Sequence, residues 1–260
     1  MLSGWLERIY LTLSRVLNYI KRYGILLCAG ESNKSKFERK CYLMGILDKF
    51  FKVKKSDYSD SSSFSSEKVQ GQYFDPILNE GALYERVAAL CSMDLFEYFM
   101  PLSDLDDQYI YSIDGNVFAK DGCGGYYVLL CDESVGYVNF SENECGRVSD
   151  SVKDLLELEL NCAYSWHNYL DKNYFQNISL LKKDAPSLEV EGHEQFGEAY
   201  GDKMPSYAEL QKDIAGKLNL NISTDITEDV LPRLYQSVQK QPEFVATSKI
   251  DKVCLGKLYQ

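Results

Sequence analysis

Histidine and tryptophan are scarce in this chain of 260 residues, which contains only two of each. Histidine is the side chain whose ordinary pKa suits proton transfer near neutral pH, so its scarcity weighs against many classes of hydrolase. The eight cysteines include no C-x-x-C pair, and neither His167 nor His193 stands at zinc-ligand spacing from them. We therefore predict no metal site and no cofactor.

Most of the cysteines are expected to be small, buried apolar side chains. Cys123, Cys131 and Cys145 belong to neighbouring predicted strands, so a disulfide among them stays open. We recognise no secretory signal, and this favours a reducing, cytoplasmic compartment with free thiols.

Charge is distributed unevenly along the chain. Residues 1–55 contain 12 basic and four acidic residues, whereas residues 56–260 contain 16 basic and 35 acidic residues. The larger part therefore carries a net charge of −19. An acidic surface repels the phosphates of nucleic acids and attracts basic proteins. We expect a basic protein partner and no direct binding of nucleic acid.

Residues 1–43 are predicted to be a basic amphipathic segment. Apolar side chains recur at helical spacing over residues 2–20, with arginines seven residues apart on another face. Charges every few residues exclude a membrane-spanning helix. One interpretation is a helix that binds a membrane surface or a partner. The other is an over-extended reading frame whose natural start is Met44.

Residues 44–73 are predicted to be a short basic helix and a Ser-rich linker that cannot pack a core. The pattern of residues 74–171 predicts a sheet domain. It begins with a helix over residues 82–92 and a further helical turn over residues 94–100. Five short strands, rich in β-branched and aromatic residues, follow over residues 109–113, 117–120, 126–131, 135–140 and 146–149.

A helix capped by Ser149 or Ser151 is predicted after the last strand, running through Cys162 toward Tyr169. A helix against an antiparallel sheet of about five or six strands makes the fold class α+β. Residues 172–260 are a helical C-terminal extension without a core of its own, which we expect to pack on the sheet domain. Its predicted elements are helices over residues 174–182, 188–199, 207–218 and 228–240, and a closing strand near residues 244–247.

Three glycines, Gly122, Gly124 and Gly125, follow Asp121 between two predicted strands. Glycine permits positive φ angles and close backbone approaches, as tight turns require. No helix follows this run, so it lacks the helix N-terminus of a phosphate-binding loop. We therefore assign these glycines a structural role in the turn.

Three segments in order resemble the SMI1/KNR4, or SUKH, superfamily: Phe118-Ala-Lys-Asp-Gly-Cys-Gly-Gly-Tyr-Tyr-Val-Leu-Leu, Ser134-Val-Gly-Tyr-Val, and Gly146-Arg-Val-Ser-Asp-Ser-Val-Lys-Asp-Leu-Leu-Glu-Leu. In that family a strand ends in an Asp-Gly-rich turn, and two further strands and a Ser-begun helix follow. The similarity covers roughly residues 80–170. Residues 1–73 and the helices after 171 depart from it, which leaves the domain boundaries open.

The resemblance implies a non-catalytic bacterial immunity protein, which neutralises a cognate toxin in the cytoplasm by binding it. Many such toxins are nucleases, and an acidic protein can occlude a basic nuclease cleft. A scaffold or regulatory protein-binding module of the same fold is the alternative, and it would share every feature above. A small enzyme is a third class, which a deep pocket with convergent polar groups would reveal.

The predicted binding surface combines acids at the hairpin ends with two tyrosines, because interfaces favour tyrosine anchors inside a charged rim. Its residues are Asp104, Asp106, Asp107, Tyr126, Asp132, Glu133, Tyr137, Glu142 and Glu144. The three aspartates do not match an EF-hand loop, so we interpret them as a solvated loop facing the partner. His167 lacks a recognisable nucleophile and orienting acid, and we assign it to an aromatic cluster.

Overall fold

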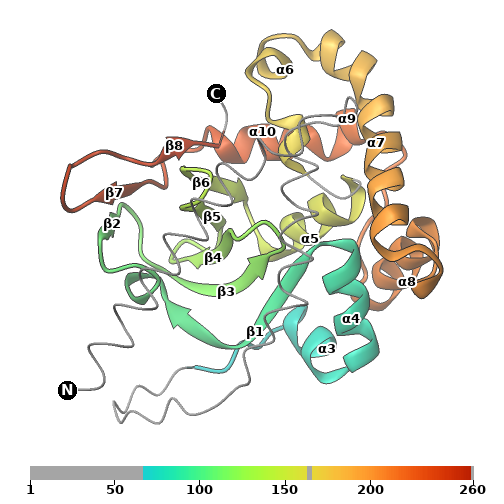
Figure 1. Ribbon diagram of the computed structural model, residues 1–260, viewed down its shortest axis with the longest axis horizontal. Coiled ribbons are helices and arrows are strands. Elements are labelled where there is room, and N and C mark those ends of the chain that lie inside the picture. Colours follow the sequence, from blue (N-terminus) through green and yellow to red (C-terminus); the bar gives the residue numbers. More distant parts are fainter. Residues whose placement is uncertain (1–66, 163–165, 259–260) are drawn as a thin grey trace, which may run out of the picture. The chain divides into compact units, whose positions relative to one another are not determined.

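The computed structural model describes residues 67–162 and 166–258 (Figure 1). The predictions for residues 1–43 and for the Ser-rich linker lie outside the described residues. Within the described part, no helix is long and apolar enough to cross a membrane.

Two short helices, α3 (Phe74–Asn79) and α4 (Gly81–Leu90), precede the first strand, and α4 confirms the helix predicted there. The helical turn predicted over residues 94–100 is wrong, because this segment forms strand β1 (Met93–Pro101). Its pairing with β3 contains an irregularity between Leu95 and Met100. The bulge breaks the two-residue alternation that identifies a strand, so the segment lacks a clear strand pattern.

The fold is α+β, as predicted, and is built on a six-stranded sheet of order β1-β3-β4-β5-β6-β8. All neighbours are antiparallel except β6 and β8. Its remaining strands are β3 (Gly115–Asp121), β4 (Tyr126–Leu130), β5 (Val135–Asn139), β6 (Glu144–Ser149) and β8 (Gly256–Lys257).

One predicted strand lies outside this sheet. After the 3-10 turn η2 (Leu102–Asp104), strand β2 (Tyr109–Tyr111) pairs with β7 (Ala246–Ser248) in a separate two-stranded sheet. Strand β7 matches the closing strand predicted near residues 244–247. The C-terminal segment therefore contributes strands to both sheets.

Helix α5 (Val152–Asn161) packs on one face of the sheet and begins at Ser151, whose hydroxyl accepts a hydrogen bond from the backbone N–H of Asp154 at 3.1 Å. The helix ends earlier than predicted, and a separate 3-10 segment, η3 (Trp166–Tyr169), adds further cover to this face.

The C-terminal extension is helical, and α8 (Tyr207–Leu218) has the predicted bounds. The helices predicted over residues 174–182 and 188–199 are replaced by the short α6 (Lys172–Gln176) and a single long helix, α7 (Ile178–Tyr200), which continues through Pro186. The remaining elements are η4 (Gly201–Lys203), α9 (Ile226–Asp229) and α10 (Leu231–Val238). Helix α10 runs beside β6 (Figure 1).

Two hydrophobic clusters occupy the two faces of the sheet. The first contains Tyr127 and Tyr137 from the sheet together with α5 and apolar residues of α7, α8 and α10. The second contains Val128 and Val138 from the opposite face, covered by Phe244 and other residues of the C-terminal segment. The extension thus completes the core on both sides. All described cysteines are free thiols.

Candidate functional site

A hydrogen-bonded chain of side chains fixes one end of the sheet. Asp121, at the end of β3, accepts hydrogen bonds from the backbone N–H groups of Cys123 (2.9 Å) and Gly125 (2.6 Å). Its second oxygen accepts from the hydroxyl of Tyr137 at 2.5 Å. Asn139 donates in turn to that hydroxyl at 3.2 Å. The turn between β3 and β4 is therefore tied to β5.

Asn139 extends the same chain to the next turn. Its side-chain oxygen Oδ1 accepts hydrogen bonds from the backbone N–H groups of Ser141 at 3.0 Å and Glu142 at 3.1 Å. The β3–β4 and β5–β6 turns lie at the same end of the sheet because consecutive strands alternate in direction. One buried network of Asp121, Tyr137 and Asn139 thus shapes both turns.

Each glycine of the β3–β4 turn meets a separate constraint. A Cβ on Gly125 would lie 2.1 Å from the hydroxyl oxygen of Tyr137, and one on Gly122 would lie 2.4 Å from Oγ of Ser92. Gly124 has φ +95°, which residues with an L side chain rarely adopt. Strand β4, not a helix, follows the turn.

Tyr137 is not a surface residue, and its prediction as an interface anchor is wrong. Its exposed fraction is 0%, because β5 is an interior strand covered on both faces. Its ring contacts those of Trp166 and His167, with centroids 5.3 and 5.1 Å away. Tyr126 instead points to the other face of the sheet and is half-buried.

A buried carboxyl group lies beside Tyr127 and Trp166, two ring neighbours of Tyr137. Glu159, on α5, is 5% exposed and accepts hydrogen bonds from the Tyr127 hydroxyl and from Nε1 of Trp166 at 2.9 Å. The pKa of Glu159 is raised to about 8, and burial is the largest cause. The hydrogen bonds from Tyr127 and Trp166 act in the opposite direction and lower this pKa. The negative charge of Asp121 acts in the same direction as burial.

His167 lies at the edge of this cluster. Its ring stacks on Trp166 with a centroid separation of 3.6 Å. Burial lowers its pKa to about 4, although the carboxylates of Asp121 and Glu142 oppose the shift. The imidazole is therefore neutral at pH 7, and its ring neighbours are aromatic.

The acids of the β4–β5 turn lie at the opposite end of the sheet. Asp132 is paired with Arg147, a guanidinium that is 2% exposed, through contacts of 3.1 and 2.8 Å. The hydrogen bond from Arg147 holds the pKa of Asp132 well below its usual range. Arg147 also donates to the backbone carbonyl of Pro242 at 3.1 Å. Asp132 therefore stabilises the fold, although both Asp132 and its neighbour Glu133 are exposed.

Asp104, Asp106 and Asp107 lie before β2. The side chain of Asp106 accepts from the backbone N–H of Gln108 at 2.8 Å, which closes an Asx turn. Lys249 donates to the backbone carbonyl of Asp107 at 2.7 Å. Nowhere in residues 67–162 and 166–258 do three or more His, Cys, Asp or Glu side chains gather in a way that could hold a metal ion.

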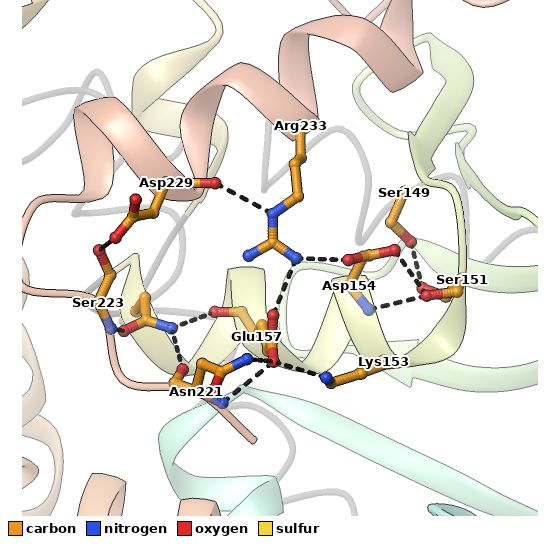
Figure 2. A network of polar contacts seen from close by, with 10 residues as sticks. Ser149, Ser151, Lys153, Asp154, Glu157, Asn221, Ser223, Asp229 and Arg233 are labelled. Carbon is orange, nitrogen blue, oxygen red and sulfur yellow. Dashed lines mark hydrogen bonds and ion pairs between the residues drawn. The ribbon is translucent and has the colours of Figure 1, made fainter. Parts of the chain in front are cut away.

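Figure 2 shows a second polar network, which joins α5 to the C-terminal extension. Arg233, on α10, contacts Asp154 and donates to Glu157 at 2.8 Å. Its Nε donates to the backbone carbonyl of Asp229 at 3.0 Å. Asn221 donates to Glu157 through its backbone N–H (3.0 Å) and its side chain (2.8 Å). The network holds the extension on α5.

Glu157 is the centre of this network and is 2% exposed. Burial opposes its ionisation, but the Asn221 N–H and the Arg233 guanidinium outweigh burial and hold its pKa below the ordinary value. No local pattern in the sequence reveals this network, because Asn221 and Arg233 follow Glu157 by 64 and 76 residues in the chain.

The predicted binding residues do not form one surface. Glu142 and Glu144 lie at the end of the sheet that carries the glycine turn, whereas Asp132 and Glu133 lie at the other end. The rings of Tyr109 and Phe140, 4.9 Å apart, bring the Asp104–Asp107 segment beside the β5–β6 turn. No family model, curated protein or solved structure matches this chain.

Proposed function

We propose that this chain is an immunity protein that binds and neutralises a cognate protein toxin, a basic nuclease of a polymorphic or contact-delivered toxin system, in the bacterial cytoplasm. The observation that carries the proposal is the net negative charge of residues 56–260, which contain 35 acidic and 16 basic residues. A protein with the charge sign of nucleic acid can occlude the basic cleft of a nuclease, and electrostatic steering accelerates its association.

The order of the elements gives further support. Strand β3, its Asp-Gly-rich turn, strands β4, β5 and β6, and the Ser151-capped α5 follow one another in the order of the SUKH pattern. The helices after residue 171 depart from that pattern. They are tied to α5 through Arg233, so they belong to the body that would meet the toxin.

The test is co-expression with the product of the gene directly upstream, followed by co-purification and a growth-rescue assay. We expect a stable complex, rescue of growth, and an association rate that falls as salt is added, because screening weakens steering. A scaffold or regulatory module of the same fold would have no toxin gene beside it. Growth arrest that persists despite co-expression would reject the proposal.

A further inference from the structure

The first described residues, 67–69, lie along β1, and we call them the edge strap. Strand β1 stands at one edge of the six-stranded sheet, with β3 beside it. Lys68 of the edge strap forms an isolated antiparallel bridge with Tyr98 of β1 (Figure 1). Gly71, which has φ +139°, stands between the edge strap and α3 and lets the chain turn away from β1. The edge strap is thus a short strand-like segment added to the edge of the sheet.

Two backbone hydrogen bonds hold the edge strap on β1. The N–H of Val69 donates to the carbonyl oxygen of Glu97 at 3.0 Å. Two residues further along β1, the N–H of Phe99 donates to the carbonyl oxygen of Glu67 at 2.9 Å. The side chain of Val69 is 0% exposed and belongs to the first hydrophobic cluster, whereas Glu67 and Lys68 are exposed. Two hydrogen bonds and one buried side chain therefore fix the edge strap.

The edge strap covers the part of β1 that lacks a partner in β3. The register pairs Leu95 and Met100 with residues of β3 but gives no β3 partner for residues 96–99 between them. Without the edge strap, the carbonyl of Glu97 and the N–H of Phe99 would be open groups at the edge of a sheet. Such groups readily pair with a strand of another chain. The edge strap therefore blocks a place where a further strand can add.

A second copy of β1 offers the same backbone groups as the edge strap. In an antiparallel pair with Glu97 opposite Phe99 of the copy, the N–H of that Phe99 takes the place of the Val69 N–H. The carbonyl of the copy's Glu97 likewise takes the place of the Glu67 carbonyl, and two-fold symmetry makes the contact reciprocal. Tyr98, which is 47% exposed, then lies opposite Tyr98 of the copy. Aromatic pairs across strands are favourable, and this register places no acid opposite an acid.

We propose that the edge strap keeps β1 from pairing with a second copy of this chain, and that its displacement opens a symmetric dimer contact centred on Tyr98. The edge strap and the second copy compete for the same two backbone groups, on Glu97 and Phe99. The edge strap has the advantage in the wild type, because it belongs to the same chain and its effective concentration is high. Loss of one of its hydrogen bonds shifts this competition toward the dimer.

Proline substitutions in the full chain test the edge strap. Val69→Pro removes the N–H that binds Glu97, whereas Lys68→Pro removes an N–H that takes part in neither hydrogen bond of the edge strap. Sedimentation equilibrium measures the dimer dissociation constant of each variant. We expect this constant to be at least ~10-fold lower in Val69→Pro than in the wild type, because the competing edge strap has lost a hydrogen bond. Lys68→Pro should match the wild type.

Tyr98→Lys, added to Val69→Pro, tests the centre of the dimer contact. Two lysines would then lie opposite each other, so we expect this double variant to be monomeric. Deuterium exchange at the Phe99 amide should be faster in the double variant than in the wild type, because neither the edge strap nor a second copy protects it. Val69→Ala, which only shortens the buried side chain, replaces Val69→Pro if thermal unfolding shows that the proline variant does not fold. A folded strap variant that remains monomeric, or that dimerises no more tightly than Lys68→Pro, would overturn the proposal.

Discussion

Gly125 lies against the hydroxyl of Tyr137, and this contact leaves no room for a side chain. A Cβ there would lie 2.1 Å from the hydroxyl oxygen and 2.2 Å from ring carbon Cζ. Tyr137 cannot withdraw, since its hydroxyl bonds Asp121 and its ring contacts Trp166. We expect Gly125→Ala to lower the free energy of unfolding by about 2–3 kcal/mol, as measured by urea denaturation.

Gly216 on α8 is the matched control, because a Cβ there would meet nothing within 4 Å. Alanine is favoured over glycine inside a helix, so Gly216→Ala should raise the free energy of unfolding by about 0.5–1 kcal/mol. We therefore expect the free energy of unfolding to fall in Gly125→Ala and to rise in Gly216→Ala. A loss of similar size at both would show that the Tyr137 contact is not the cause.

Glu159 should make stability depend on pH. Its pKa of about 8 in the folded protein lies above its ordinary value of 4.5, so the folded state holds this proton more tightly. The resulting stabilisation is complete below pH 4.5 and is lost as the pH rises to 8. His167 acts oppositely, but only between its folded pKa of about 4 and its ordinary 6.5. Between pH 6.5 and 8 the effect of Glu159 is therefore unopposed by His167.

In that window we expect the wild-type free energy of unfolding to fall by about 1 kcal/mol per pH unit. Glu159→Gln keeps an acceptor for Tyr127 and Trp166 but does not titrate, so its curve should be flat there. The exposed Glu85→Gln on α4 should retain the wild-type slope. The measurement is urea denaturation across pH, and an undiminished slope in Glu159→Gln would contradict the assignment.

Elements with strong local signals could be predicted from the sequence, and those set by long-range pairing could not. Strands β3 to β6 stand between Asp and Gly turns, and α8 has a capping box from Ser206 to Glu209. Strand β1 carries a bulge that hides its alternation. Strand β8 has two residues and exists because β6 pairs with it, which no local pattern encodes.

The Arg233 network should contribute measurably to the docking of α10 on α5. Arg233→Met keeps an apolar side chain but removes the ion pairs with Asp154 and Glu157. The buried Glu157 then has no guanidinium to balance its negative charge. We expect a loss of about 2 kcal/mol, less than for a fully buried pair because Arg233 is 40% exposed. A double-mutant cycle with Glu157→Gln should show coupling of about 1–2 kcal/mol.

The ion pair of Lys240 with Asp150 offers a control between the same parts of the chain. Both side chains are about 40% exposed and 2.7 Å apart. Exposed pairs contribute little, so a cycle of Lys240→Met and Asp150→Asn should give coupling below about 0.5 kcal/mol. Equal coupling in the two cycles would mean that burial of Glu157 does not strengthen its network.

Across the whole molecule, the acidic balance can be read from the sequence, but the arrangement of the acids cannot. Asp132 and Glu142 both follow predicted strands, yet the turns that carry them lie at opposite ends of the sheet. Tyr126 and Tyr137 both lie in predicted strands, but Tyr126 is half-buried on one face of the sheet and Tyr137 is fully buried on the other. The face that carries Tyr126 is covered by residues 244–255, more than 100 positions away in the chain.

That coverage predicts that the sheet region cannot fold without the C-terminal extension. A chain that ends at residue 171 would lose Phe244 and Leu255 from one face of the sheet, and α7, α8 and α10 from the other cluster. Each large side chain removed from a core costs about 2–5 kcal/mol, and a domain's whole stability is about 5–15 kcal/mol. We expect no cooperative thermal unfolding of this truncated chain and rapid proteolysis, with the full chain as control. A sharp transition in the truncated chain would instead show that residues up to 171 form an autonomous domain.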